Sequence, residues 1–187
     1  MRRFVTAGAG VVVAVVLAAP ASASPQPLVV GPGKVGSLKM GTTTTAAQQA
    51  GWISIDPVCQ DWTAGPRAYK SNRHGEVYKA YPDQIKKGRV VSMWSTGHVV
   101  TARGIHTEGL GARAERGSTV ISLREAYPGL IKQGTWYNST SGDYMRVFTI
   151  GDRKQGYLDF FVAGKRVSFV VARTKAVAWS VGPSEGC

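Results

Sequence analysis

The sequence predicts an α+β fold in which two similar units follow one another, each a short helix or helical hairpin packed on an antiparallel β-meander. The helix-like segment 41–51 has an echo at 117–127, an offset of 117 − 41 = 76 residues. The same offset places the strand-like run 88–94 on 164–170. One offset that relates both a helix start and a later strand indicates an internal duplication.

Residues 1–23 have the pattern of a secretory signal peptide. Arg2 and Arg3 precede a short apolar core at 11–19, and an Ala-x-Ala cleavage site ends at Ala23. The apolar run is shorter than the roughly 18 to 20 residues that span a bilayer, so we expect cleavage and no membrane span afterwards. The remaining 187 − 23 = 164 residues suffice for one domain or for two small units with a shared core. We therefore expect a secreted, extracellular protein, and a monomer.

The chain is strongly basic. Its formal net charge is +12, and loss of Arg2 and Arg3 would leave 12 − 2 = +10. Such a balance favours anionic partners, among which we expect a cell-wall component or a protein surface rather than nucleic acid. Charge also keeps a secreted protein soluble without any partner, so it gives the sign of a partner and not its identity.

Two cysteines, Cys59 and Cys187, are present in a chain that we expect to leave the cytoplasm. An even number of cysteines in an oxidising compartment predicts a disulfide between them. A metal site would need more ligands than these cysteines and the scattered His74, His98 and His106, whose spacing matches no zinc pattern. We expect neither a metal nor another cofactor.

The first unit spans 35–106 and follows a lead-in at 24–34 that its prolines and glycines predict to be flexible. Gly41 and Thr42 mark the start of the first helix, with Thr42 as its N-cap. Strands are predicted at three runs of β-type residues, 76–81, 89–94 and 98–102. In the second run Val91 and Met93 should face the core, opposite Val90, Ser92 and Trp94.

The second unit spans 107–187. Gly117 and Ser118 mark the start of its helix, with Ser118 as the N-cap, and Leu123 lies on the apolar stripe. Alternating residues predict strands at 144–150, 156–163, 166–173 and 175–181. We expect one core face to carry Val167, Phe169 and Val171. The segment 133–142 is predicted to be an exposed loop.

These features resemble those of a group of uncharacterised secreted actinobacterial proteins. The residues that carry the resemblance are Leu38 to Thr42 with Ala46 and Ala47, Thr107 to Gly109, Gly117 to Thr119 with Tyr127 and Pro128, and the two cysteines. More distantly, the repeat is similar to the β-lactamase inhibitory proteins and the small outer-membrane-assembly lipoproteins. That resemblance implies units with a short helical hairpin on an antiparallel sheet. The inhibitory proteins have a cysteine pair within each unit, whereas this chain has one cysteine in the first unit and one at its end.

The sequence contains no recognisable catalytic motif. It lacks a Gly-x-Ser-x-Gly elbow, a His-Glu-x-x-His pair and a Cys-x-x-Cys pair. The pairs His74 with Glu76 and His106 with Glu108 could share a strand face as acid and base, but two polar residues at that spacing are more often a solvated face. We therefore expect a protein that is not an enzyme.

Aromatic and basic residues are the better candidates for function. Tyr, Trp and Arg dominate binding hot spots because they bury much area at a low entropic cost, although a small sheet protein also needs aromatic residues in its core. The candidate contact residues are Trp62, Tyr69, Trp94, Trp136, Tyr137, Tyr144, Lys86 and Lys87. The favoured hypothesis is a binding protein that engages a protein or cell-wall component through a sheet face and loops, with inhibition of a protein as one form of such binding. The alternative is an envelope-associated structural protein that adheres to anionic polymers through its basic surface.

The disulfide gives the first testable prediction. Closing a loop of 187 − 59 = 128 residues should stabilise the fold by about 4 to 5 kcal/mol in the chain-entropy treatment, an upper figure because strain and residual structure reduce it. Thiol titration of the denatured, unreduced mature protein should therefore find no free thiol. Two reactive thiols would contradict the pairing.

Overall fold

The structure is a computed structural model that describes residues 28–71, 77–97, 99–109, 116–139 and 141–179. The strands are β1 (Leu28–Gly31), β2 (Lys34–Val35), β3 (Leu38–Lys39), β4 (Ile53–Ile55), β5 (Trp62–Ala64), β6 (Tyr69–Ser71), β7 (Val77–Lys86), β8 (Arg89–Gly97), β9 (Val99–Thr101), β10 (Ile131–Asn138), β11 (Asp143–Asp152), β12 (Gly156–Ala163) and β13 (Arg166–Arg173). The helices of the described residues are α1 (Thr44–Gln49) and α2 (Val120–Ala126). The predicted α+β fold of tandem helix-on-meander units is wrong, because the described chain is mostly β and its two helices have only six and seven residues.

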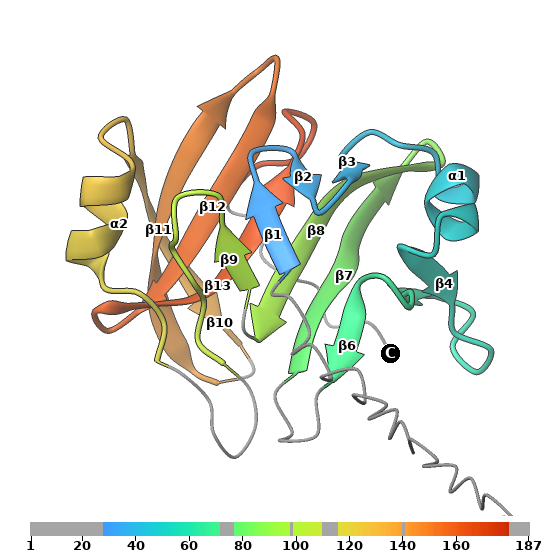
Figure 1. Cartoon of the computed structure of the whole chain (residues 1–187), viewed down its shortest axis with the longest axis horizontal. Coiled ribbons are helices and arrows are strands. Elements are labelled where there is room, and N and C mark those ends of the chain that lie inside the picture. Colours follow the sequence, from blue (N-terminus) through green and yellow to red (C-terminus); the bar gives the residue numbers. More distant parts are fainter. Residues whose placement is uncertain (1–27, 72–76, 98, 110–115, 140, 180–187) are drawn as a thin grey trace, which may run out of the picture.

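The strands form one large and two small sheets in the described part of the chain. The large sheet is antiparallel, in the order β10-β11-β12-β13-β8-β7-β6. A four-stranded sheet, β3-β2-β1-β9, lies in front of it in Figure 1, between α2 on one side and α1 on the other, and β4 pairs with β5 separately. Neither helix has the length and apolar character that crossing a membrane requires.

The predicted flexible lead-in is wrong over its described part, because β1 is a buried strand. Its pairing with β9 is parallel and joins Leu28 to Val99, which are 99 − 28 = 71 residues apart. Leu28 and Val30 are buried in the core between the two sheets, while Val29 points outward. A parallel partner so far along the chain leaves no local signal in the sequence, so only the prolines and glycines beside β1 were visible.

Both helices begin one residue later than predicted. The N-caps are Thr43 and Thr119, whose hydroxyls accept hydrogen bonds from the backbone N–H of Ala46 and Ser122. Thr42 is used elsewhere, because its hydroxyl donates to the Lys39 carbonyl at 2.7 Å.

The same substitution of roles occurs at the second helix. Ser118 accepts a hydrogen bond from the His106 N–H at 3.1 Å and does not cap α2. Arg89 donates to the Gly41 carbonyl, and Arg166 donates to the Gly117 carbonyl, at 2.7 and 2.9 Å. Each glycine is therefore held by the first residue of a strand of the large sheet, so the 76-residue offset relates these local contacts although the predicted fold class fails.

The main core lies between the large sheet and the elements in front of it. It contains Leu123 of α2 and Ala47 of α1, together with side chains from both larger sheets. The predicted core face of β8 is wrong, since Val90 and Met93 belong to this core together. The pairing Gln84↔Ser92 is followed by Ile85↔Val90, so a β-bulge at Val91 shifts the alternation by one residue.

A second bulge corrects the prediction for β13. Phe161 pairs with Phe169 and Val162 with Val167, which leaves Ser168 as the extra residue. Val167 therefore joins the main core, whereas Phe169 and Val171 face the opposite side of the sheet. There they form the outer cluster, which consists of the buried residues Met145, Val147, Phe161, Phe169 and Val171 with the partly buried Trp94, Trp136, Ala163 and Trp179 packed against them.

The C-terminal segment is also different from its prediction. Residues 174–179 form turns and not the expected strand, and within them Val177 is buried. A side chain at Gly134 of β10 would meet the Trp179 ring at 2.8 Å, so the segment crosses the outer face of the sheet from β13 to β10. The predicted loop at 133–142 is wrong up to Asn138, because these residues continue β10 as an edge strand.

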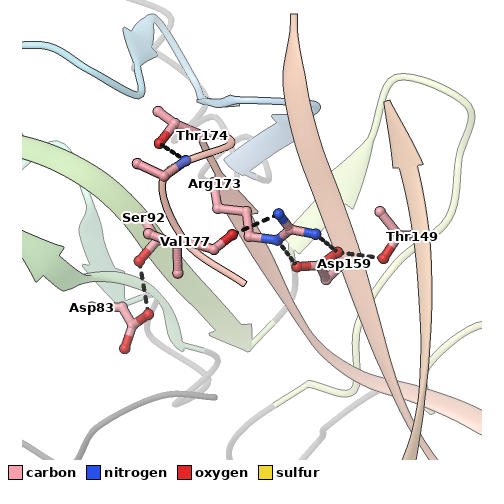
Figure 2. Close-up of polar contacts among 8 residues, drawn as sticks. Asp83, Ser92, Thr149, Asp159, Arg173, Thr174 and Val177 are labelled. Atoms are coloured by element: carbon pink, nitrogen blue, oxygen red, sulfur yellow. Dashed lines mark hydrogen bonds and ion pairs between the residues drawn. The ribbon is translucent and has the colours of Figure 1, made fainter. Parts of the chain in front are cut away.

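An ion pair is buried beneath this segment, on the outer face of β12 and β13. The Nε and Nη2 groups of Arg173 both donate to the Asp159 carboxylate, which also accepts from the Thr149 hydroxyl at 2.5 Å (Figure 2). The third donor, Nη1, bonds the Val177 carbonyl at 2.8 Å, and the guanidinium lies over the Tyr157 ring. The pair therefore connects β11, β12 and β13 and fixes the start of the covering segment.

A change at this carboxylate gives a stability prediction. Asp159→Asn keeps the shape but leaves the Arg173 charge buried without a counter-charge, so it should lower the free energy of unfolding by about 3 to 5 kcal/mol. Asp143→Asn removes an exposed carboxylate of β11 and should change it by less than about 0.5 kcal/mol. Urea denaturation of both variants measures the difference, and equal midpoints would contradict the structural role of the pair.

Candidate functional site

The candidate site is a groove of about 810 Å³ where the small sheet, the end of α2 and the β11–β12 hairpin meet. A volume of this size is within the range of pockets that hold small ligands. Its charged lining residues are Lys34, Lys39, Arg103, Lys154 and Asp152, four cations and one anion. Its apolar lining includes Met40, Tyr127 and Ile150.

One wall of the groove is made by two lysines on adjacent strands. Lys34 of β2 and Lys39 of β3 are directly opposite one another in the strand register, and their neighbours Val35 and Leu38 are buried on the other face. Like charges at directly opposed positions of an antiparallel pair are destabilising. Among the described residues neither lysine is in an ion pair, so nothing in that part of the chain offsets their repulsion.

Arg103 is held in place at the next part of the lining. Its Nη1 group donates to the Ala126 carbonyl at 2.6 Å, at the C-terminal end of α2, where carbonyl groups lack helical partners. Its guanidinium also lies over the Tyr127 ring, 5.3 Å from the centroid. Because a guanidinium has five N–H donors, this anchoring leaves Arg103 able to bind a carboxylate or a phosphate as well.

The opposite wall is the β11–β12 hairpin, which packs tightly on the turn between β1 and β2. The Gly33 N–H donates to the Tyr157 carbonyl at 3.1 Å. Gly33 has φ +60°, and a side chain there would lie 2.2 Å from the Gln155 carbonyl oxygen. The close approach of the two turns, and with it this side of the groove, therefore depends on a glycine.

The acidic residue of the lining serves the hairpin itself. Asp152 accepts hydrogen bonds from the backbone N–H groups of Gln155 and Lys154 at 2.8 and 2.7 Å. These two bonds, the Gln155 bond first, hold the pKa of Asp152 below its ordinary value of 3.8, and the Lys154 charge adds a smaller effect in the same direction. The carboxylate thus stays ionised near neutral pH, and the charged lining sums to 4 − 1 = +3.

The residues predicted from the sequence do not form one surface. Trp94 and Trp136 are partly buried in the outer cluster, where both contact Phe169 edge to face. Tyr137 and Tyr144 form a pair with ring centroids 5.0 Å apart and are 50% and 73% exposed.

The remaining aromatic candidates lie far from these in the sheet order. Trp62 of β5 packs against the main core, and Tyr69 of the edge strand β6 is 42% exposed. The contact surface suggested by the sequence is thus divided among the outer cluster, one end of the β10–β11 pair and the β5–β6 side. None of these residues lines the groove.

The basic candidates Lys86 and Lys87 are at the β7–β8 turn. Both are exposed, and Lys86 donates to the Ala176 carbonyl at 3.0 Å. Lys87 has φ 51° and precedes Gly88 at φ 65°, which is the backbone of a type I′ hairpin turn. Cys59 lies in a turn whose backbone N–H bonds Asp56, whereas Cys187 and the signal segment 1–23 are outside the described residues. The disulfide and the cleavage stay predictions.

The sequence reasoning missed every residue of the groove. The paired valine, leucine and lysines of 34–39 alternate as a small hairpin would, and that signal could have identified Lys34 and Lys39 as neighbours. Arg103 and Lys154 carried no comparable local signal, because they reach the groove from distant parts of the chain. In the described ranges no three His, Cys, Asp or Glu side chains gather as metal ligands would.

Comparison with known proteins found no matching family model, no matching curated protein and no matching solved structure.

The Asp152 hydrogen bonds give a pH prediction. Because its pKa is lower in the folded than in the unfolded protein, Asp152 stabilises the fold above the unfolded value near 3.8, and this contribution is lost as the pH falls through the folded pKa. An NMR titration of the side-chain carboxyl should give a midpoint below 3.8, and Asp152→Asn should remove this acid-side loss. A midpoint at or above 3.8 would contradict the hydrogen-bonded turn.

Proposed function

We propose that this protein is secreted and acts by binding, not by catalysis, and that it holds an anionic group of its partner in the groove. The observation that supports this most is the facing pair Lys34 and Lys39 on one wall. Two opposed cations destabilise a free sheet edge, and a bound anion would turn their repulsion into two attractive contacts. Arg103 and Lys154 add two more cations to the same lining.

The anchoring of Arg103 supports specific binding rather than general adhesion. A guanidinium already fixed by the Ala126 carbonyl and the Tyr127 ring loses little freedom when it takes up a ligand. The partner can be an anionic cell-wall component or an acidic group on a protein, since both offer carboxylate or phosphate oxygens. The groove replaces the aromatic sheet face as the site we favour.

The alternative, adhesion to anionic polymers through the whole basic surface, is favoured by the exposed Lys86 and Lys87 at a distant turn. The two functions differ in where the charge must be. A groove requires particular cations, whereas surface adhesion depends on the number of cations and is strongly screened by salt.

Paired charge changes separate these functions. Binding of inorganic pyrophosphate is measured by NMR titration of the mature protein at low and at moderate salt. Lys34→Gln/Lys39→Gln should weaken it at least tenfold, about 1.4 kcal/mol, because it removes two direct contacts. The matched control Lys86→Gln/Lys87→Asn, in which asparagine tolerates the positive φ, should change it less than threefold.

The location of the shifts provides a second criterion. Pyrophosphate should shift amide signals at 31–40, 102–103 and 151–155, the parts of the chain that line the groove. Equal weakening by both double variants would support adhesion instead. Absence of any binding by the wild-type protein would refute both functions.

A further inference from the structure

Apolar side chains form a second part of the groove, between its charged walls. This inference rests on the proposed function, and it concerns the part of the partner that the cations do not contact. Met40 and Ile150 are partly buried and pack on the main core, and Tyr127 is buried against the Phe160 ring. All three line the groove.

These apolar residues are fixed in position. The Met40 N–H donates to the Gly33 carbonyl at 2.8 Å, and the Tyr127 N–H donates to the Leu123 carbonyl at 3.0 Å. Arg103 over the Tyr127 ring places a cation directly beside an aromatic surface. A ligand headgroup held by Arg103 would therefore have its remaining atoms next to an apolar surface and not in water.

A purely ionic ligand uses only half of such a site. Inorganic phosphate or a bare carboxylate would contact the cations and leave the apolar lining wet, so it would gain nothing from that surface. A ligand with an attached ring or short chain would remove apolar surface from water on both sides. The volume of about 810 Å³ admits a small molecule of this kind.

We infer that the groove binds a soluble amphiphilic anion, a phosphate or carboxylate headgroup joined to an aromatic or short aliphatic body. The headgroup lies among Lys34, Lys39 and Arg103, and the body lies against Met40, Tyr127 and Ile150. The same chemistry occurs in anionic lipids, so a free small molecule and a lipid in a membrane have to be distinguished by experiment.

Matched ligands test this on the wild-type mature protein. Affinities for inorganic phosphate and phenyl phosphate are compared by NMR titration, and those for acetate and benzoate give a second pair. The member with the ring should bind at least tenfold more tightly in each pair. Equal affinities within a pair would overturn the inference and leave the proposed function intact, whereas failure of all four anions to bind would overturn both.

A variant locates the ring. Met40→Gln keeps the length of the side chain but removes its apolar character, so it should reduce the advantage of phenyl phosphate over phosphate to below threefold without weakening phosphate. Ile131→Gln, at a residue of β10 that is 59% exposed and outside the groove, should leave the advantage unchanged. An undiminished advantage in folded Met40→Gln would overturn the assignment of the ring to this lining.

Vesicles separate the two sources of the ligand. Phosphatidylcholine vesicles with 20% phosphatidic acid, a proportion of about one anionic lipid in five, present the same headgroup in a membrane. We expect the soluble ligands to bind and the vesicles to be retained no better by the wild-type protein than by Lys34→Gln/Lys39→Gln. Vesicle binding that depends on these lysines, with no binding of phenyl phosphate, would overturn the inference.

Discussion

The buried ion pair between Asp159 and Arg173 is the constraint on which the large sheet depends. A carboxylate and a guanidinium can be buried on a sheet face only if every donor and lone pair has a partner and water is excluded. Thr149 and the Val177 carbonyl supply the partners, and the segment 174–179 supplies the cover. The second face of β10–β13 is therefore closed by the chain itself, which explains why Trp94 and Trp136 are partly buried there.

Parts of the fold that depend on short-range patterns could be predicted from the sequence. The strands β8, β12 and β13 lie where alternating residues placed them, and Leu123 is buried as its helical stripe predicts. The faces of β8 and β13 could not be predicted, because a single extra residue in each strand, Val91 and Ser168, reverses the alternation. The sheet class was wrong because pairing across 71 residues, as between β1 and β9, leaves no local trace.

The candidate site was less predictable than the fold. Aromatic residues attract attention in a sequence because they are frequent in interfaces, but the same property makes them frequent in cores. Here Trp136 packs on Phe161 and Phe169, while the groove is lined mainly by lysines, glycines and single apolar residues from separate elements. Only the Lys34 and Lys39 pair is local enough to be found from the sequence, as two residues at the ends of one small hairpin.

The contact between Gly33 and the β11–β12 hairpin also has a consequence for the order of folding. Gly33 lies near the beginning of the chain, and its hydrogen-bond partner Tyr157 lies 157 − 33 = 124 residues later. Contacts of such long sequence separation have a high loop-closure entropy, so they form after the local hairpins. As the chain emerges from its N-terminus, β1 has no partner until β9 follows, and the groove has no second wall until β12 is present. Binding competence is therefore acquired only by the nearly complete chain, late in its maturation.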